Sequence, residues 1–307
     1  MSTAFSYAVS EADASLANWI CGSLALAILT ARLVGHRWQH SRLDLSAYLV
    51  IMSIVVLIAR IICNTVVLRD KTIRTSQQDS TNLRTGSIVT LITRILVTTF
   101  YWLQCTLLLV FYRDMLDHMT WIARIIKSCW IFMACTYITV VLVTFLECRP
   151  IRLYWTMDDA SQPHTCTKAY GQLFTQCISI AIIDSLLLVI SAPILRSQIR
   201  QFPRNLQLGL LYTLGFFSLI VIGFRLHFIH RDGSAQRARS FWASIQVVTA
   251  TFVANAPSIY GACKNVRRRK ESVDSLARAR TRTQGSDESY GREEVIARVA
   301  PAARMRL

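Results

Sequence analysis

The feature that most constrains this chain is a series of apolar runs, each long enough to cross a lipid bilayer. An α-helix needs about 20 apolar residues to span roughly 30 Å of hydrocarbon. Seven such runs occur within residues 1–263, and short connections separate them. The sequence therefore predicts an all-α, polytopic bundle of seven transmembrane helices, with spans over residues 16–34, 45–68, 87–112, 126–146, 169–195, 206–228 and 241–262.

The composition agrees with a membrane protein and excludes several other classes. Hydrophobic residues make up 53% of the 307 residues and charged residues only 17%, whereas soluble domains have about a quarter of their residues charged. This balance excludes a disordered chain, a secreted disulfide scaffold and an ordinary soluble enzyme. Because the apolar residues also come in long blocks, we expect no nucleic-acid partner despite the net charge of +16.

The basic residues predict that the N-terminus lies outside and the C-terminus in the cytosol. The loops alone do not favour either orientation, so the segment 264–307 decides it. That segment is polar and basic, lacks apolar periodicity, and is predicted to be a disordered cytosolic tail. Its cluster Arg267–Lys270 follows the last span, where positive charge most strongly marks the inner side. The first 15 residues contain no Lys or Arg, so we expect no cleavable signal peptide.

Three observations predict that the protein uses no cofactor. All five lysines lie in loops, at a span boundary or in the tail, whereas a retinal pigment needs a buried lysine for its Schiff base. The histidines and cysteines form no HExxH or CxxC pattern, so no metal site is expected. The sequence also contains no Walker motif and no GxGxxG, so nucleotide use is not indicated.

Four arginines and one aspartate fall within the predicted spans, where a charge costs at least about 2.5 kcal/mol and usually has a partner. Arg32 is within a turn of the inner boundary, and we expect its side chain to reach the interface. Arg60, Arg94 and Arg225 lie on polar faces in the outer half of the bundle, because the polar residues recur at helical spacing. Asp184 lies near the middle of its span.

These positions predict a polar cavity that suits a carboxylate or another anionic group, because arginine presents a bidentate fork. The candidate substrate-binding residues are Arg60, Arg94, Tyr101, Arg225 and Gln246. Asp184 is the candidate catalytic acid or base. Arg239, by contrast, falls in the outer loop before the last predicted span. In the alternative interpretation, Asp184 pairs with one arginine and the others reach outer loops or lipid phosphates.

Cys148 and Cys166 are the two cysteines that share a loop, and the predicted topology places that loop outside. The outer side of a cellular membrane is an oxidising compartment, in which disulfides form and persist. The sequence therefore predicts a disulfide between Cys148 and Cys166, which would hold the loop over the mouth of the cavity.

A set of short motifs follows a fixed order along residues 15–263. The motifs are Tyr112 with Arg113; Phe145 with Cys148, Pro150, Trp155 and Cys166; Asp184 with Pro193; Leu214, Gly215 and Phe216 with Arg225 and Leu226; and Trp242 with Gln246, Ala256 and Pro257. Together they resemble the fungal rhodopsin-domain family of seven-transmembrane proteins, of the type encoded in the satratoxin cluster. The chain resembles a divergent member, because Asp44, Gln104 or Cys105, and Gln246 stand where that family has a paired Asp, a Lys and a Glu.

The resemblance implies a multi-pass protein of the endoplasmic reticulum or plasma membrane that takes part in mycotoxin-type secondary-metabolite biosynthesis. It would act as an accessory protein, or as a cofactor-free acid–base enzyme on a lipophilic acid. The implied partners are membrane lipids, a lipophilic anionic small molecule, and biosynthetic enzymes or signalling proteins at the cytosolic face. The alternative is a receptor-like sensor that signals through the inner loops and tail. A small transporter is less favoured, because the sequence shows no internal repeat.

Overall fold

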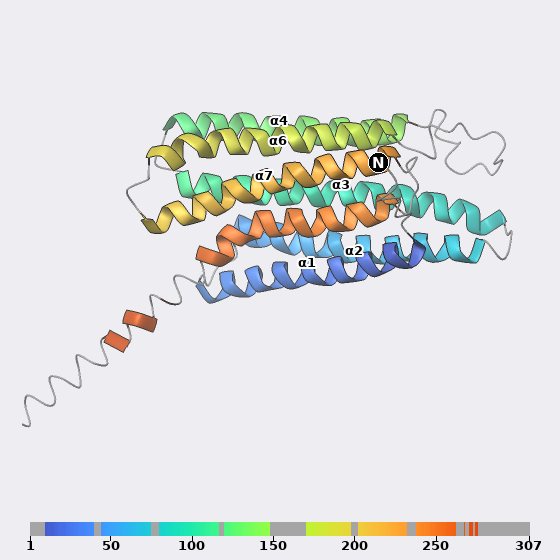
Figure 1. Ribbon diagram of the computed structural model, residues 1–307, viewed down its shortest axis with the longest axis horizontal. Helices are drawn as coiled ribbons and strands as arrows, with labels where there is room; N and C mark the ends of the chain where they lie inside the picture. The colour runs from blue at the N-terminus through green and yellow to red at the C-terminus, as the bar shows by residue number, and fades with distance from the viewer. Residues whose placement is uncertain are drawn as a thin grey trace, which may run out of the picture. The chain divides into compact units, whose positions relative to one another are not determined.

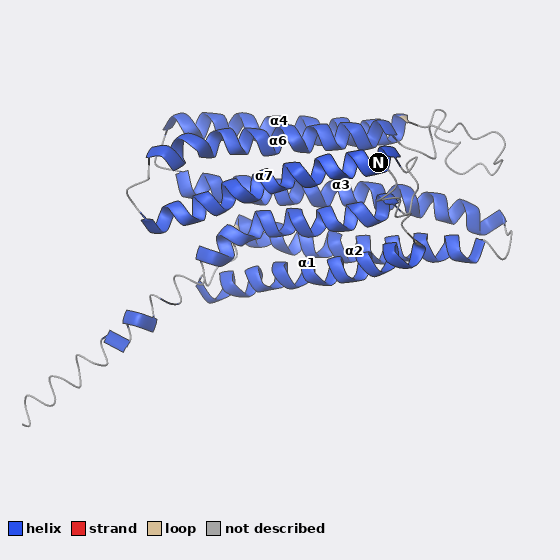
Figure 2. Cartoon of the chain, in the orientation of Figure 1, coloured by secondary structure: helices blue, strands red, loops and turns tan. Residues whose placement is uncertain are grey.

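The computed structural model describes residues 10–39, 44–74, 80–116, 120–147, 170–197, 202–231 and 238–261, together with 267, 270–272 and 274–275. The described residues are almost entirely helical and include no strand, as Figure 2 shows. The helices are α1 (Glu11–Gln39), α2 (Leu45–Arg74), α3 (Ser80–Leu116), α4 (Thr120–Leu146), α6 (Tyr170–Ser197) and α7 (Phe202–Arg231), followed by a helix over residues 238–261, called helix 238–261 below. The predicted all-α class is confirmed.

Five of the described helices are long and apolar enough to cross a membrane, over Ala12–Trp38, Leu45–Leu68, Ile88–Asp114, Arg124–Leu146 and Tyr170–Val189. α7 adds a shorter apolar stretch, Tyr212–Phe228. Helix 238–261 is not among these apolar helices, and its buried polar residues are Arg239, Ser240, Ser244, Gln246, Thr249, Thr251 and Asn255. The chain is thus a multi-pass helical membrane protein, while the exact number of seven spans and the outward-facing N-terminus remain predictions.

The helices of the unit Met1–Ile259 run beside one another along a common direction (Figure 1). α2 packs against both α1 and α3, α4 lies against α3 and α6, and α6 packs against α7. Gly22 allows the close approach of α1 to α2, because a Cβ atom there would lie 2.6 Å from Cδ1 of Ile61. The second compact unit, Tyr260–Leu307, contains the predicted tail.

The surface of the bundle is apolar where that of a soluble protein would be polar. On α2, Val55, Ile58 and Ile62 are exposed at helical spacing, whereas Arg60 and Asn64 of the same helix are buried. A helix that turns its apolar face outward and its polar face inward is typical of a bundle in lipid, since polar groups there need protein partners.

Two helices form much of the interior. α3 buries a series of large apolar side chains that includes Phe100, Leu107 and Leu109. Helix 238–261 makes hydrogen bonds to Arg32 on α1, Arg60 on α2, Tyr101 on α3 and Arg225 on α7. It is therefore the element around which the polar side chains of the bundle are arranged.

Candidate functional site

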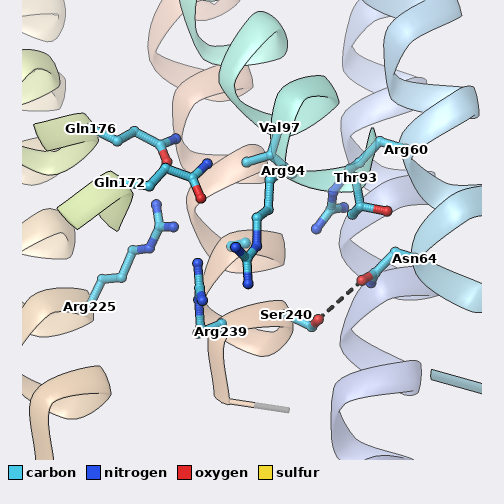
Figure 3. Close-up of a pocket in the computed structure, with 11 residues that line it drawn as sticks. Arg60, Asn64, Thr93, Arg94, Val97, Gln172, Gln176, Arg225, Arg239 and Ser240 are labelled. Atoms are coloured by element: carbon cyan, nitrogen blue, oxygen red, sulfur yellow. Dashed lines mark hydrogen bonds between the residues drawn. The ribbon is translucent and has the colours of Figure 1, made fainter. Parts of the chain in front are cut away.

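A polar cavity of about 50 Å³ lies inside the bundle. Four arginines line it, and for this reason we call it the arginine cavity; Figure 3 shows the side chains around it. The lining residues are Arg60 and Asn64 from α2; Thr93, Arg94 and Val97 from α3; Gln172 and Gln176 from α6; Arg225 from α7; and Arg239, Ser240 and Ala243 from helix 238–261.

Helical periodicity explains how each segment presents its residues to the cavity. Residues three or four apart share one face of a helix, which is the spacing of Arg60 with Asn64 and of Gln172 with Gln176. A side chain that follows α4 also holds the first turn of α6. Oε1 of Glu147 accepts hydrogen bonds from the backbone N–H of Gly171 at 2.7 Å and of Gln172 at 3.3 Å. The carboxylate of Glu147 thus stabilises the start of α6.

The structure brings together all five predicted substrate-binding residues. Arg60, Arg94 and Arg225 line the cavity directly. Tyr101 and Gln246 lie just behind Arg225: the Arg225 Cζ atom is 6.0 Å from the centre of the Tyr101 ring, and Nη1 of Arg225 donates a hydrogen bond to Oε1 of Gln246. The Tyr101 hydroxyl in turn donates to a backbone carbonyl of helix 238–261, at 3.1 Å.

Arg239 lines the arginine cavity, although the sequence analysis expected it in an outer loop. It was expected in an outer loop because the last predicted span began at residue 241, but helix 238–261 begins before it, and its side chain is buried. Gln172 and Gln176 were also missed. Their spacing of four residues within an apolar segment is a signal that could have identified them.

Some nitrogen atoms at the cavity have no hydrogen-bond partner within the part of the chain that the structure describes. Nη2 of Arg60 donates to Oγ of Ser244 at 2.8 Å, but its Nε and Nη1 have none, although the residue is only 1% exposed. Nε of Arg225, Nδ2 of Asn64 and Nε2 of Gln176 are likewise buried without an acceptor. Each buried donor without an acceptor costs about 1–3 kcal/mol of folding free energy. These donors therefore destabilise the protein when no ligand is bound.

Asp184 lies outside the arginine cavity. Its Oδ2 accepts a hydrogen bond of 2.7 Å from the hydroxyl of Ser218 on α7. Asp184 follows Gln176 by eight residues on α6, which corresponds to about 12 Å along a helix. Among the residues that the structure describes, no ion pair joins Asp184 to an arginine. Asp184 is therefore paired with a serine, and not with an arginine as the alternative interpretation expected.

Arg32 differs from the expectation of the sequence analysis, because its side chain is buried and hydrogen-bonded to protein groups. Its Nη1 donates to the carbonyl of Ala254 at 3.1 Å and to Oδ1 of Asn255 at 3.0 Å, and its Nη2 donates to Oγ of Ser46 at 3.0 Å. Nδ2 of Asn255 donates to Oε1 of Gln104 at 3.2 Å. These five residues form what we call the Arg32 cluster. Acceptors on helix 238–261 hold the arginine inside the bundle. The sequence predicted a span over residues 241–262 but not that it lies beside Arg32.

Two further predictions concern other chemistry. Cys148 and Cys166 lie outside the described residues, so their disulfide remains a prediction. Among the residues that the structure describes, no group of three or more His, Cys, Asp or Glu side chains could hold a metal ion.

Comparison with known proteins gives one finding. The family model described as the fungal rhodopsin domain matches residues 31–268, which is most of the chain and includes every residue of the arginine cavity and of the Arg32 cluster. No curated protein and no solved structure matches the chain.

Proposed function

The chain belongs to the fungal rhodopsin domain family, and from this premise we propose that it binds a lipophilic acid inside the membrane through the arginine cavity. In this proposal the protein takes part in a fungal secondary-metabolite pathway as an accessory protein that holds an acidic intermediate or product. The pathway follows from the family resemblance, while the bound group follows from the cavity.

The observation that carries the proposal is that Arg60 and Arg225 have buried guanidinium nitrogens with no acceptor among the described residues. Four arginines from four helices line the cavity, and none of the described side chains that line it is a carboxylate. Buried charges in proteins are normally paired or neutralised. An anionic ligand supplies a negative charge and accepts hydrogen bonds from these nitrogens of Arg60 and Arg225.

The position of Asp184 favours an accessory role over catalysis at the cavity. An acid or base must come within hydrogen-bond reach of the group on which it acts. Asp184 lies about two helical turns from the nearest lining residues of its own helix, and it already accepts a hydrogen bond from Ser218. A ligand group bound by the arginines would therefore lie out of its reach.

The receptor-like alternative has one specific observation in its favour. Helix 238–261 carries Arg239 and Ser240 at the cavity and Asn255 in the Arg32 cluster. These sites are about 15 residues apart, or roughly 22 Å along the helix. Ligand binding at one end could therefore shift the helix at the other end, as a sensor requires.

A deletion strain tests the pathway. Mass spectrometry of its extracts should show an acidic, lipophilic compound that accumulates or disappears, and re-expression of the wild-type chain should restore the original profile. An unchanged metabolite profile together with a lost response to an external compound would contradict the biosynthetic role and support the sensor.

A binding measurement tests the site itself. Purified protein in maltoside micelles should bind dodecanoate but not its uncharged methyl ester, because only the former carries the negative charge. The double variant Arg60→Gln/Arg225→Gln should lose this binding, whereas Arg267→Gln, whose side chain is 84% exposed, should retain it. Equal binding of the acid and the ester would contradict the proposed site.

A further inference from the structure

We propose that the acid held in the arginine cavity is a 2-hydroxy acid, whose hydroxyl group binds to Gln172 and Gln176. This inference rests on the proposed function, because it names the class of ligand that the same site takes. The observations that carry it are the polar atoms without partners on two neighbouring amides, the difference between two sides of the cavity, and the size of the cavity.

The first step concerns the polar atoms that α6 contributes. Gln172 and Gln176 line the cavity and are 2% and 3% exposed. Oε1 of Gln172 and Nε2 of Gln176 have no hydrogen-bond partner among the residues that the structure describes. The oxygen is an acceptor, the nitrogen is a donor, and residues four apart share one face of a helix. A ligand group that binds to both amides must therefore donate one hydrogen bond and accept another.

The second step concerns α2, whose polar atoms without partners are all donors. Nε and Nη1 of Arg60 and Nδ2 of Asn64 have no acceptor among the described residues. Oδ1 of Asn64 already accepts a hydrogen bond from Oγ of Ser240 at 3.1 Å. Figure 3 shows Arg60 and Asn64 on the side of the cavity opposite the two glutamines. The α2 side thus suits a carboxylate, which only accepts hydrogen bonds, whereas the α6 side suits a group of a different kind.

The third step identifies this second group. A hydroxyl oxygen donates one hydrogen bond and accepts two, so it can bind to Oε1 of Gln172 and Nε2 of Gln176 at once. A second carboxylate only accepts and would leave the Gln172 oxygen without a donor. An ammonium group only donates, and Arg225, which also lines the cavity, would repel its positive charge. A hydroxyl is therefore the small group that satisfies both amides.

The fourth step concerns size. One water molecule needs at least about 10–15 Å³ of such space, so a cavity of about 50 Å³ holds only a few non-hydrogen atoms. A carboxylate with a hydroxyl on the adjacent carbon is the smallest group that combines the two functions. Val97 and Ala243 are the apolar lining residues, so a hydrocarbon chain attached to this group lies outside the cavity. The cavity therefore selects the polar end of the ligand.

The test compares four probes that differ only at the polar end. 2-Hydroxydodecanoate carries the proposed group, dodecanoate lacks the hydroxyl, and 2-oxododecanoate carries an oxygen that accepts but cannot donate. Methyl 2-hydroxydodecanoate lacks the negative charge. Each probe is titrated into the purified full-length chain in maltoside micelles, and calorimetry gives its affinity after subtraction of protein-free micelles. We expect 2-hydroxydodecanoate to bind at least about tenfold more tightly than each of the other three.

The variant Gln172→Met links the hydroxyl to the cavity, because methionine has a similar length but only a weak acceptor. The quantity compared is the ratio of the affinities for 2-hydroxydodecanoate and dodecanoate within one protein. This ratio should fall to within about twofold in Gln172→Met. It should keep its wild-type value in Ser185→Ala, because Ser185 is exposed on the same helix. An unchanged ratio in Gln172→Met would overturn the assignment of the hydroxyl to Gln172.

The outcomes separate the two proposals. If 2-hydroxydodecanoate and dodecanoate bind equally well, and both lose binding in Arg60→Gln/Arg225→Gln, the 2-hydroxy inference is wrong and the proposed function stands. If 2-oxododecanoate binds as tightly as the hydroxy acid, the hydroxyl donates no hydrogen bond in the site. The inference is then wrong as well, and this comparison needs no substitution in the protein. If no acid binds more tightly than methyl 2-hydroxydodecanoate, both proposals are wrong.

Discussion

The arginine cavity and the Arg32 cluster both place arginine side chains inside the bundle with neutral polar neighbours. Arg32 donates three hydrogen bonds to acceptors from α2 and helix 238–261. In the arginine cavity, by contrast, two nitrogens of Arg60 and one of Arg225 have no acceptor among the described residues. Burial alone therefore does not distinguish a binding arginine from a structural one. The number of acceptors that the protein supplies does.

This difference has opposite consequences for stability and for binding. The Arg32 cluster supplies its own acceptors, so each of its contacts stabilises the folded protein. In the arginine cavity, buried nitrogens of Arg60 and Arg225 have no acceptor among the described residues, so these two residues reduce stability until an anion binds. Substitutions in the two regions should therefore affect different measurements, and this separation can be tested.

The largest effect on stability is expected for Arg32→Ala. The substitution removes three hydrogen bonds and takes the arginine donor away from the buried Oδ1 of Asn255, so we expect a loss of about 2–4 kcal/mol. The loss of stability is measured by thermal unfolding of the purified protein in micelles. Arg37→Ala is the matched control, because Arg37 is exposed near the end of the same helix. A comparable melting temperature for both variants would contradict a structural role of the Arg32 cluster.

The double variant Arg60→Gln/Arg225→Gln should show the reverse behaviour. Stability should change by less than about 1 kcal/mol, because the loss of the Arg60–Ser244 and Arg225–Gln246 hydrogen bonds is offset by the removal of buried donors that have no acceptor. Binding of an anionic amphiphile should nevertheless fall by at least about tenfold. A loss of stability as large as that of Arg32→Ala would mean that these arginines are structural too.

Asp184→Asn should affect neither measurement strongly. Asparagine keeps an acceptor oxygen for the Ser218 hydroxyl, and we expect a change in stability below about 1 kcal/mol and affinity within about twofold of the wild type. The comparison with Ser218→Ala, which removes the donor, isolates this hydrogen bond. If Asp184→Asn abolished product formation in the complemented strain while binding persisted, the catalytic hypothesis for Asp184 would be restored.

Tyr101→Phe should also have only a small effect on both measurements. The substitution removes one hydrogen bond to the carbonyl of Ala243 but keeps the ring 6.0 Å from Arg225. Stability should fall by about 1 kcal/mol, and affinity for the anion should change by less than about threefold. A larger loss of affinity would show that the Tyr101 hydroxyl contacts the ligand, which would extend the site beyond its lining residues.

The sequence predicts the helical class and part of the site, for reasons that differ from residue to residue. Arg60, Arg94 and Arg225 were found because a charge in an apolar run is costly and therefore informative. Arg239 was missed because the hydropathy of a run locates helix ends only within a few residues. Arg32 was misinterpreted because its acceptors on helix 238–261 are more than 200 residues away in sequence. Helical periodicity predicts which face a residue occupies but not which helix lies opposite.

The central claim is that donors without protein acceptors mark the binding site, and the most direct test is the shift in melting temperature caused by ligand. Wild type, Arg60→Gln/Arg225→Gln and Arg32→Gln are each heated with and without dodecanoate at about 100 times the wild-type Kd, where binding adds about 2.7 kcal/mol to stability. The account predicts a full shift for the wild type, no shift for the double variant, and a lower starting temperature with a full shift for Arg32→Gln. A full shift in the double variant, or none in Arg32→Gln, would contradict it.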